Sequence, residues 1–198
     1  MGAIHDQEKN LHFVEQIELQ AEQLERQIQD LLELARVEAG KAAFRISRVS
    51  INDVSQKCFR QFSSTADENQ IRLNLQLSQE NPFVRADCDA IETIIKNLVV
   101  NAIHYTPAGG SVTIETIAEQ THAVIRVIDT GIGIASDHQA RIFERFYRVD
   151  RARSRDKGGT GLGLSIVKHL AHAFDGSVRL ESQIGKGSKF LVRFPLAK

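Results

Sequence analysis

Three short motifs in a fixed order constrain this chain more than any bulk property. They are Asn-Leu-Val-Val-Asn at 97–101, Asp-Thr-Gly-Ile-Gly at 129–133 and Gly-Thr-Gly-Leu-Gly at 159–163. The first lies within a helical pattern, the second ends an alternating strand pattern, and the third begins another helical pattern. Together they predict one pocket made of an amide-bearing helix face, a buried carboxylate and a glycine loop. We interpret this pocket as an ATP site.

Composition limits the class of protein. The chain has 198 residues, of which 42% are hydrophobic, enough for one sizeable domain and an accessory element. Basic and acidic residues both number 25, which argues against nucleic acid or an anionic membrane as a partner. Cys58 and Cys88 lack metal or redox spacing and are expected to be reduced core residues of a cytoplasmic protein. Membrane anchoring of a longer parent protein stays open.

The N-terminal segment predicts one long helix. Residues 8–39 contain neither Gly nor Pro, and apolar residues recur in steps of three and four. These seam residues are Val14, Ile17, Ala21, Leu24, Ile28, Leu31 and Ala35. The helix either docks on its own domain or forms half of a dimerising helical hairpin, and the seam favours the hairpin. We expect Gly40 to end it, which divides the chain into 1–40 and 41–198.

The remainder predicts a two-layer α/β sandwich, with helices on one face of a mixed sheet. We expect helices at 50–63, 89–105, 136–146 and 164–174, with Asp89 and Ser136 capping the second and third. Expected strands are 43–48, 71–77, 83–87, 112–117, 123–129, 177–182 and 189–194.

The helix at 89–105 offers oxygen ligands on one face. Asn97, Asn101 and His104 lie at i, i+4 and i+7, within about 40° of one another on a helix. Amide oxygens suit Mg²⁺, which prefers few protein ligands plus phosphates and water. The alternative is a pair of solvent-exposed amides without a ligand.

Asp129 ends a strand on the side that carries Ile125 and Val127, so its carboxylate is expected to face the core. A buried carboxylate needs a donor, and an adenine amino group could supply one. Gly131 and Gly133 would let the backbone approach a planar base. The alternative is an ordinary Asp-Thr-Gly turn.

A glycine run precedes the last helix. Gly159, Thr160, Gly161, Leu162 and Gly163 would place free N–H groups at a helix start, where they can bind phosphate. Leu164 breaks the dinucleotide-binding fingerprint, and no Lys-Ser/Thr pair follows the last glycine as a P-loop requires.

A basic, aromatic stretch joins the second and third motifs. Arg145, Arg148 and Lys157 could grip a γ-phosphate while its charge spreads in the transition state. A basic patch for nucleic acid and a merely solvated connection are the alternatives.

These residues resemble the catalytic and ATP-binding domain of bacterial sensor histidine kinases, within the wider GHKL ATPase superfamily and its Bergerat-type fold. Residues 97–107 resemble the N box, 129–133 the G1 box, 143–148 the F box and 159–163 the G2 box. The resemblance also extends to 24–40, which are similar to the second helix of the dimerisation and histidine-phosphotransfer domain.

The resemblance implies roles for single residues. Asn101 would be the Mg²⁺ ligand, with Asn97 beside the phosphates, Tyr105 along the nucleotide and Asp129 on the adenine amino group. Arg145, Arg148 and residues 159–163 would belong to the ATP lid. His104 stands where many members have a phosphate-contacting Lys.

The resemblance also implies the reaction and the partners. The family's phosphoacceptor segment is absent, because His5 is followed by Asp-Gln-Glu and by no Pro. The γ-phosphate would therefore go to a histidine on a helical hairpin outside this sequence, and then to an Asp of a response regulator, in a parent protein that forms a homodimer.

Two other functions remain open. A GHKL ATPase would place a water-activating Glu four residues before the metal-binding Asn, where this chain has Asn97, an amide that cannot take the proton. A non-catalytic, nucleotide-sensing dimerisation module is the third reading.

Overall fold

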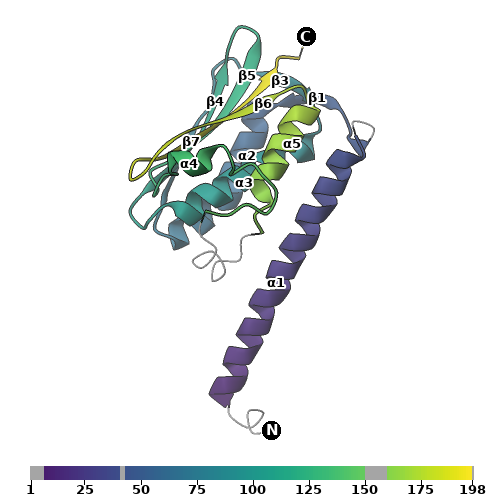
Figure 1. Ribbon diagram of the computed structural model, residues 1–198. Helices are drawn as coiled ribbons and strands as arrows, with labels where there is room; N and C mark the ends of the chain where they lie inside the picture. The colour runs from purple at the N-terminus through teal and green to yellow at the C-terminus, as the bar shows by residue number, and fades with distance from the viewer. Residues whose placement is uncertain (1–6, 41–42, 150–159, 198) are drawn as a thin grey trace.

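The computed structural model describes residues 7–40, 43–149 and 160–197 (Figure 1). A long helix, α1 (Gln7–Glu38), precedes a sandwich of short helices and strands. The sandwich begins with β1 (Ser47–Ser50), α2 (Ile51–Glu68), β2 (Arg72–Gln76), β3 (Phe83–Ala86) and α3 (Cys88–Tyr105). It continues with β4 (Ser111–Ala118), β5 (His122–Asp129), α4 (Ser136–Gln139), α5 (Gly163–Ala173), β6 (Ser177–Gln183) and β7 (Gly187–Pro195).

The main sheet has the strand order β2-β4-β5-β7-β6. The β2–β4 pair is parallel and the other pairs are antiparallel, so the sheet is mixed. Strands β1 and β3 pair separately. Helices α2, α3 and α5 cover one face of the main sheet (Figure 1). The predicted two-layer α/β sandwich is therefore confirmed.

The core lies between this sheet and the three helices. Alternate residues of the two hairpin strands face inward, and Ile114, Ile125 and Val127 are fully buried. Ile94 and Leu98 of α3 are fully buried against the same layer. A helix with one apolar stripe can bury that stripe and leave another stripe at the edge of the core.

Several predicted element ends were wrong, and α2, which was expected to end at residue 63, continues to Glu68. Asp87, and not Asp89, caps α3, because its Oδ1 accepts hydrogen bonds from the N–H groups of Asp89 and Ala90. Helix α4 is only four residues long, and Ser136 donates to Asp137 instead of capping the helix. The strand expected at 43–48 is β1, displaced to Ser47–Ser50.

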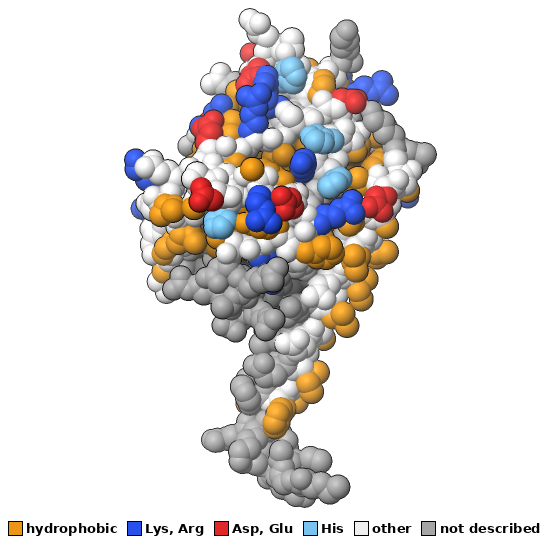
Figure 2. Space-filling view, in the orientation of Figure 1, with side chains coloured by type: hydrophobic (Ala, Val, Ile, Leu, Met, Phe, Trp, Pro, Cys, Tyr) orange, Lys and Arg blue, Asp and Glu red, His pale blue; other side chains and the backbone are white. Residues whose placement is uncertain are grey.

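Helix α1 docks only by its C-terminal end. Leu34 is buried and Phe44, just beyond the helix, stacks edge-on against Phe174 with ring centroids 5.1 Å apart. The rest of α1 projects past the sandwich (Figure 1), and Figure 2 shows hydrophobic side chains along the projecting part. Val14, Ile17, Ala21, Leu24, Ile28, Leu31 and Ala35 are all exposed. In this structure the helix therefore docks on its own domain by its C-terminal end alone, and its seam does not take part.

The two cysteines differ. Cys58 is fully buried, and burial raises the pKa of its thiol to about 12, which keeps it protonated. Cys88 is exposed at the start of α3, so its expected place in the core was wrong. In the described part of the chain, no helix combines the length and apolarity needed to cross a membrane.

Candidate nucleotide-binding site

Helix α3 places the predicted amide stripe at the rim of the core. Asn97, Asn101 and His104 are all half-buried, on the side of α3 next to its buried stripe. Asn97 donates from Nδ2 to the backbone oxygen of Thr93, at 2.9 Å. This bond holds the Asn97 amide along the helix and leaves its Oδ1 directed away from Thr93.

Oδ1 of Asn97 lies against the start of α5. A Cβ added to Gly163, the first residue of α5, would lie 2.5 Å from this oxygen. A larger residue at position 163 would therefore have to displace the Asn97 amide. The structure thus brings the first and third motifs together, although they are far apart in the sequence.

Asp129 lies at the end of β5 and is 6% exposed. Its Oδ1 accepts two backbone hydrogen bonds, from Gly131 N at 2.8 Å and Ser188 N at 3.1 Å. Among the described residues, no hydrogen bond to Oδ2 is recorded, so this oxygen can accept from a ligand donor. Burial raises the pKa of Asp129, and the two N–H groups act in the opposite direction.

The loop after Asp129 is held between α3 and the last hairpin. Ile132 N donates to the backbone oxygen of Tyr105, at 3.2 Å, and a Cβ on Gly131 would overlap that same oxygen. Gly133 has a φ of +70°, and a Cβ there would overlap the backbone of Gln183. The second motif is therefore joined to the end of the first motif's helix by backbone contacts that require glycine.

Tyr105 closes α3 and is exposed, with its ring centroid 4.7 Å from that of His104. The pair lies at the C-terminal end of the amide stripe. An exposed aromatic side chain next to the Asp129 loop is in a suitable place to contact a nucleotide.

The third motif shapes the start of α5. Thr160 Oγ1 accepts from Leu162 N at 3.1 Å, and Leu162 is buried at the N-cap position without a side-chain capping bond. The first N–H groups of α5 thus remain suited to an anion. Gly161, at φ +74°, packs against the backbone of Phe146, whose N–H donates to the Gly161 oxygen at 2.9 Å.

The two arginines predicted to bind phosphate differ in their surroundings. Arg145 is exposed and forms an ion pair with Glu38 of α1, with Nη1 and Oε1 2.9 Å apart. Arg148 is half-buried. Lys157, Gly159 and His5 lie outside the described residues, so the predictions made for them stay predictions.

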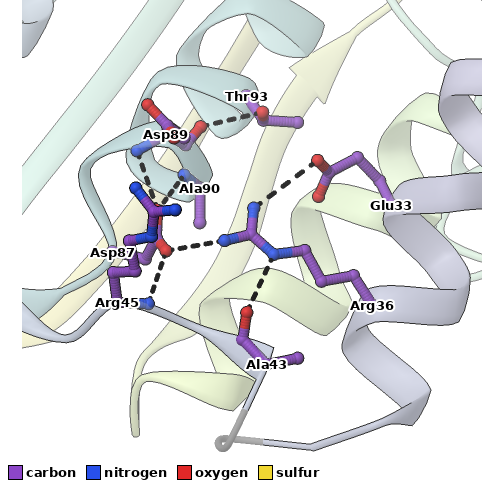
Figure 3. Close-up of polar contacts among 8 residues, drawn as sticks. All are labelled: Glu33, Arg36, Ala43, Arg45, Asp87, Asp89, Ala90 and Thr93. Atoms are coloured by element: carbon purple, nitrogen blue, oxygen red, sulfur yellow. Dashed lines mark hydrogen bonds and ion pairs between the residues drawn. The ribbon is translucent and has the colours of Figure 1, made fainter.

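An ion-pair network joins α1 to the start of α3 (Figure 3). Asp87 is 2% exposed, and its Oδ2 accepts from Arg36 Nη2 and from Arg45 N, both at 2.8 Å. Arg36 also donates from Nε to the Ala43 oxygen and pairs with Glu33. Asp87 therefore fixes the start of the helix that carries Asn97.

Sequence reasoning missed this network and the support of Asp129 by Ser188. The Asp87-Cys-Asp89 sequence offered two acidic caps, and a buried partner for Asp87 could have been sought among the arginines near α1. The bond from Ser188 N depends on the pairing of Asp129 with Ser188 across β5 and β7.

The donor set fits Mg-ATP by its chemistry. Asn101 offers an amide oxygen, while the described residues contain no group of three or more His, Cys, Asp or Glu side chains that could form a metal cage. A cation here would therefore need oxygens from a phosphate ligand, as Mg²⁺ in nucleotide sites does.

Known proteins resemble this chain in sequence and fold. Residues 86–198 match the family described as histidine kinase-, DNA gyrase B-, and HSP90-like ATPase. The sensor histidine kinase RppB of Synechocystis is 41% identical over 186 residues, which are 94% of this chain and 40% of RppB. The sensor-like histidine kinase SenX3 of Mycolicibacterium smegmatis is 38% identical over 195 residues, 98% of this chain and 50% of SenX3.

A solved structure extends the likeness to α1. Full-length ShkA in complex with AMPPNP superposes with a TM-score of 0.81 at 29% identity, over 94% of this chain and 39% of ShkA. The chain spans half or less of the length of these three proteins. It belongs to the histidine kinase-, DNA gyrase B- and HSP90-like ATPase family, and its fold is that of the ATP-binding catalytic domain of histidine kinases.

Proposed function

We propose that this chain binds Mg-ATP and transfers the γ-phosphoryl group to a histidine of a helical hairpin, from which it passes to an Asp of a response regulator. The observation that carries the proposal is Asp129. Its Oδ1 is held by two backbone N–H groups, which leaves Oδ2 to accept the adenine amino group. The AMPPNP complex of ShkA and the sensor kinase relatives support the same reading.

Asn101 would hold Mg²⁺, which would neutralise charge on the phosphate oxygens. Asn97 would lie beside the phosphates, since it contacts the start of α5, where N–H groups can bind an anion. Arg145 and Arg148, with Lys157 and residues 159–163, would complete the phosphate contacts. His104 and Tyr105 would flank the nucleotide at the end of α3.

Position 97 favours transfer over hydrolysis. An amide cannot accept a proton from water, so Asn97 cannot act as the general base that a hydrolytic ATPase needs at this position. The GHKL ATPase alternative is therefore less well supported than the kinase. A purely nucleotide-sensing module would use the same nucleotide contacts, so the assay for phosphoryl transfer below separates it from a kinase.

Residues 1–40 would be the second helix of the dimerisation hairpin, and residues 41–198 the catalytic domain. The exposed seam of α1 supports this division, because a helix with an apolar stripe in water needs a helical partner. We propose that the partner helices come from the same hairpin and from a second copy of the protein.

The test uses γ-labelled ATP and Mg²⁺, with this chain alone and with the histidine-bearing hairpin of a relative added. We expect acid-labile label on the added hairpin and little free phosphate. Rapid phosphate release without labelled protein would instead establish a hydrolytic ATPase, and label on this chain alone would mean that the acceptor lies within it.

Two substitutions test the assigned contacts. Asn101→Ala should abolish Mg-ATP binding or transfer, whereas Asn74→Ala, which removes an exposed amide on the edge strand β2, should leave both unchanged. Asp129→Asn should weaken ATP more than it weakens tripolyphosphate, which has no base. Equal weakening of the two ligands would contradict the adenine contact.

A further inference from the structure

Two acidic side chains of α1 contact residues that flank the phosphate end of the proposed site. Asp30 Oδ2 accepts from Thr160 Oγ1 at 2.6 Å, and Glu38 Oε1 lies 2.9 Å from Arg145 Nη1. Asp30, Leu34 and Glu38 are spaced i, i+4 and i+8, so they share one face of α1. The buried Leu34 lies between the two acids, which makes these contacts part of the docked face of the helix.

Both contacts occupy groups that a phosphate would use. The Thr160 hydroxyl already accepts from Leu162 N, and its single proton points to Asp30, so it has no proton left to donate to a phosphate oxygen. The Arg145 guanidinium is paired with the Glu38 carboxylate, which is negatively charged like a phosphate and would compete with it for the same cation. Burial raises the pKa of the Asp30 carboxyl overall, and the hydrogen bond from Thr160 acts in the opposite direction.

We propose that docked α1 competes with the triphosphate of ATP for Thr160 and Arg145. The proposal rests on the function proposed above. When α1 is docked, the carboxylates of Asp30 and Glu38 hold the two groups that the proposed triphosphate contacts need, so ATP binds more weakly. By linkage, bound ATP must weaken the docking of α1 by the same factor. The helix then acts as a brake on nucleotide binding that a rotation or shift of α1 would release.

The first experiment compares Mg-ATP and adenosine by calorimetric titration of the whole chain. The variant is the double substitution Asp30→Ala and Glu38→Ala, and the control is Glu18→Ala, which removes an exposed carboxylate of the same helix. Because one contact is an exposed ion pair and the other a half-buried bond to a carboxylate, we expect roughly three- to tenfold tighter Mg-ATP binding.

Adenosine should bind the parent, the variant and the control equally, since it carries no phosphate. An unchanged Mg-ATP affinity in the double variant would overturn the competition while leaving the proposed function intact. Equal tightening by Glu18→Ala would also overturn it, because the effect would then be general charge. A parent chain that binds no Mg-ATP would overturn the proposed function and this inference together.

A second measurement reads the reciprocal effect. Backbone hydrogen exchange in residues 30–38 should become faster when the parent chain is saturated with Mg-ATP, and the double variant should show fast exchange from the start. Slower exchange in the parent with Mg-ATP would show that nucleotide strengthens the docking, which is the opposite of the proposal.

Discussion

Replacing Asp87 with Asn removes one buried charge and changes almost no volume. In the structure, Oδ1 caps α3 and Oδ2 accepts from Arg36 and from the N–H of Arg45 (Figure 3). An Asn side chain has one oxygen and one NH₂ group. In either orientation, the NH₂ group therefore faces two donors and cannot accept from them.

The size of the effect follows from the burial of each partner. If the Asn oxygen keeps the cap, the Arg45 N–H loses its acceptor, which costs about 1–3 kcal/mol. The Arg36 side chain is 27% exposed and can be rehydrated, so the loss of its ion pair adds about 1–2 kcal/mol. We therefore expect Asp87→Asn to lower the free energy of unfolding by about 2–5 kcal/mol.

Urea unfolding, followed by circular dichroism with linear extrapolation, measures this change. The matched control is Asp89→Asn, two residues later on the same helix and exposed, which should lose no more than about 1 kcal/mol from its interaction with the helix dipole. Arg36→Met completes a double-mutant cycle, and we expect the two losses to be clearly non-additive. A loss below about 0.5 kcal/mol for Asp87→Asn would refute the reasoning.

Two further predictions concern the Asp129 region. Burial raises the pKa of Asp129 above its ordinary 3.8, so Mg-ATP affinity should fall as the pH falls through that raised value. Asp129→Asn should remove this pH dependence, and an equal slope of affinity against pH in both proteins would contradict the prediction. The same raised pKa means that this carboxyl's contribution to stability is full at low pH and is lost as the pH rises through its folded value. Gly187→Ala should lower the melting temperature more than Gly185→Ala, because both residues have positive φ but only at Gly187 would a Cβ overlap the backbone of Asp129. We expect the free energies of unfolding of the two variants to differ by about 2 kcal/mol or more, and equal melting temperatures would contradict this.

The sequence predicted those parts of the site that depend on local periodicity. The alternation along β5 placed Asp129 on the buried side, and helical spacing placed Asn97 and Asn101 on one face of α3. It did not predict which of two nearby acids caps α3, because local spacing allows both. Asp87 is selected by Arg36, which comes from another part of the chain.

The contacts around the phosphate end were also beyond local patterns. The hydrogen bond between Asp30 and Thr160 depends on how α1 leaves the sandwich, and no periodicity within either segment encodes that angle. The same holds for helix α4, which was predicted to reach Phe146 but ends at Gln139. In that segment Phe146 takes a positive φ and its N–H bonds to Gly161, so a tertiary contact overrides helix propensity.

The position of β7 in the sheet affects how the protein can assemble during synthesis. Strand β7 lies between β5 and β6, although it follows both in the sequence. While a ribosome is still making residues 187–195, β5 and β6 have no shared neighbour, and Asp129 lacks the N–H group of Ser188. The carboxylate that we propose to bind the base therefore gains its second N–H donor only when β7 inserts, so we expect ATP to stabilise the nascent chain only after that step.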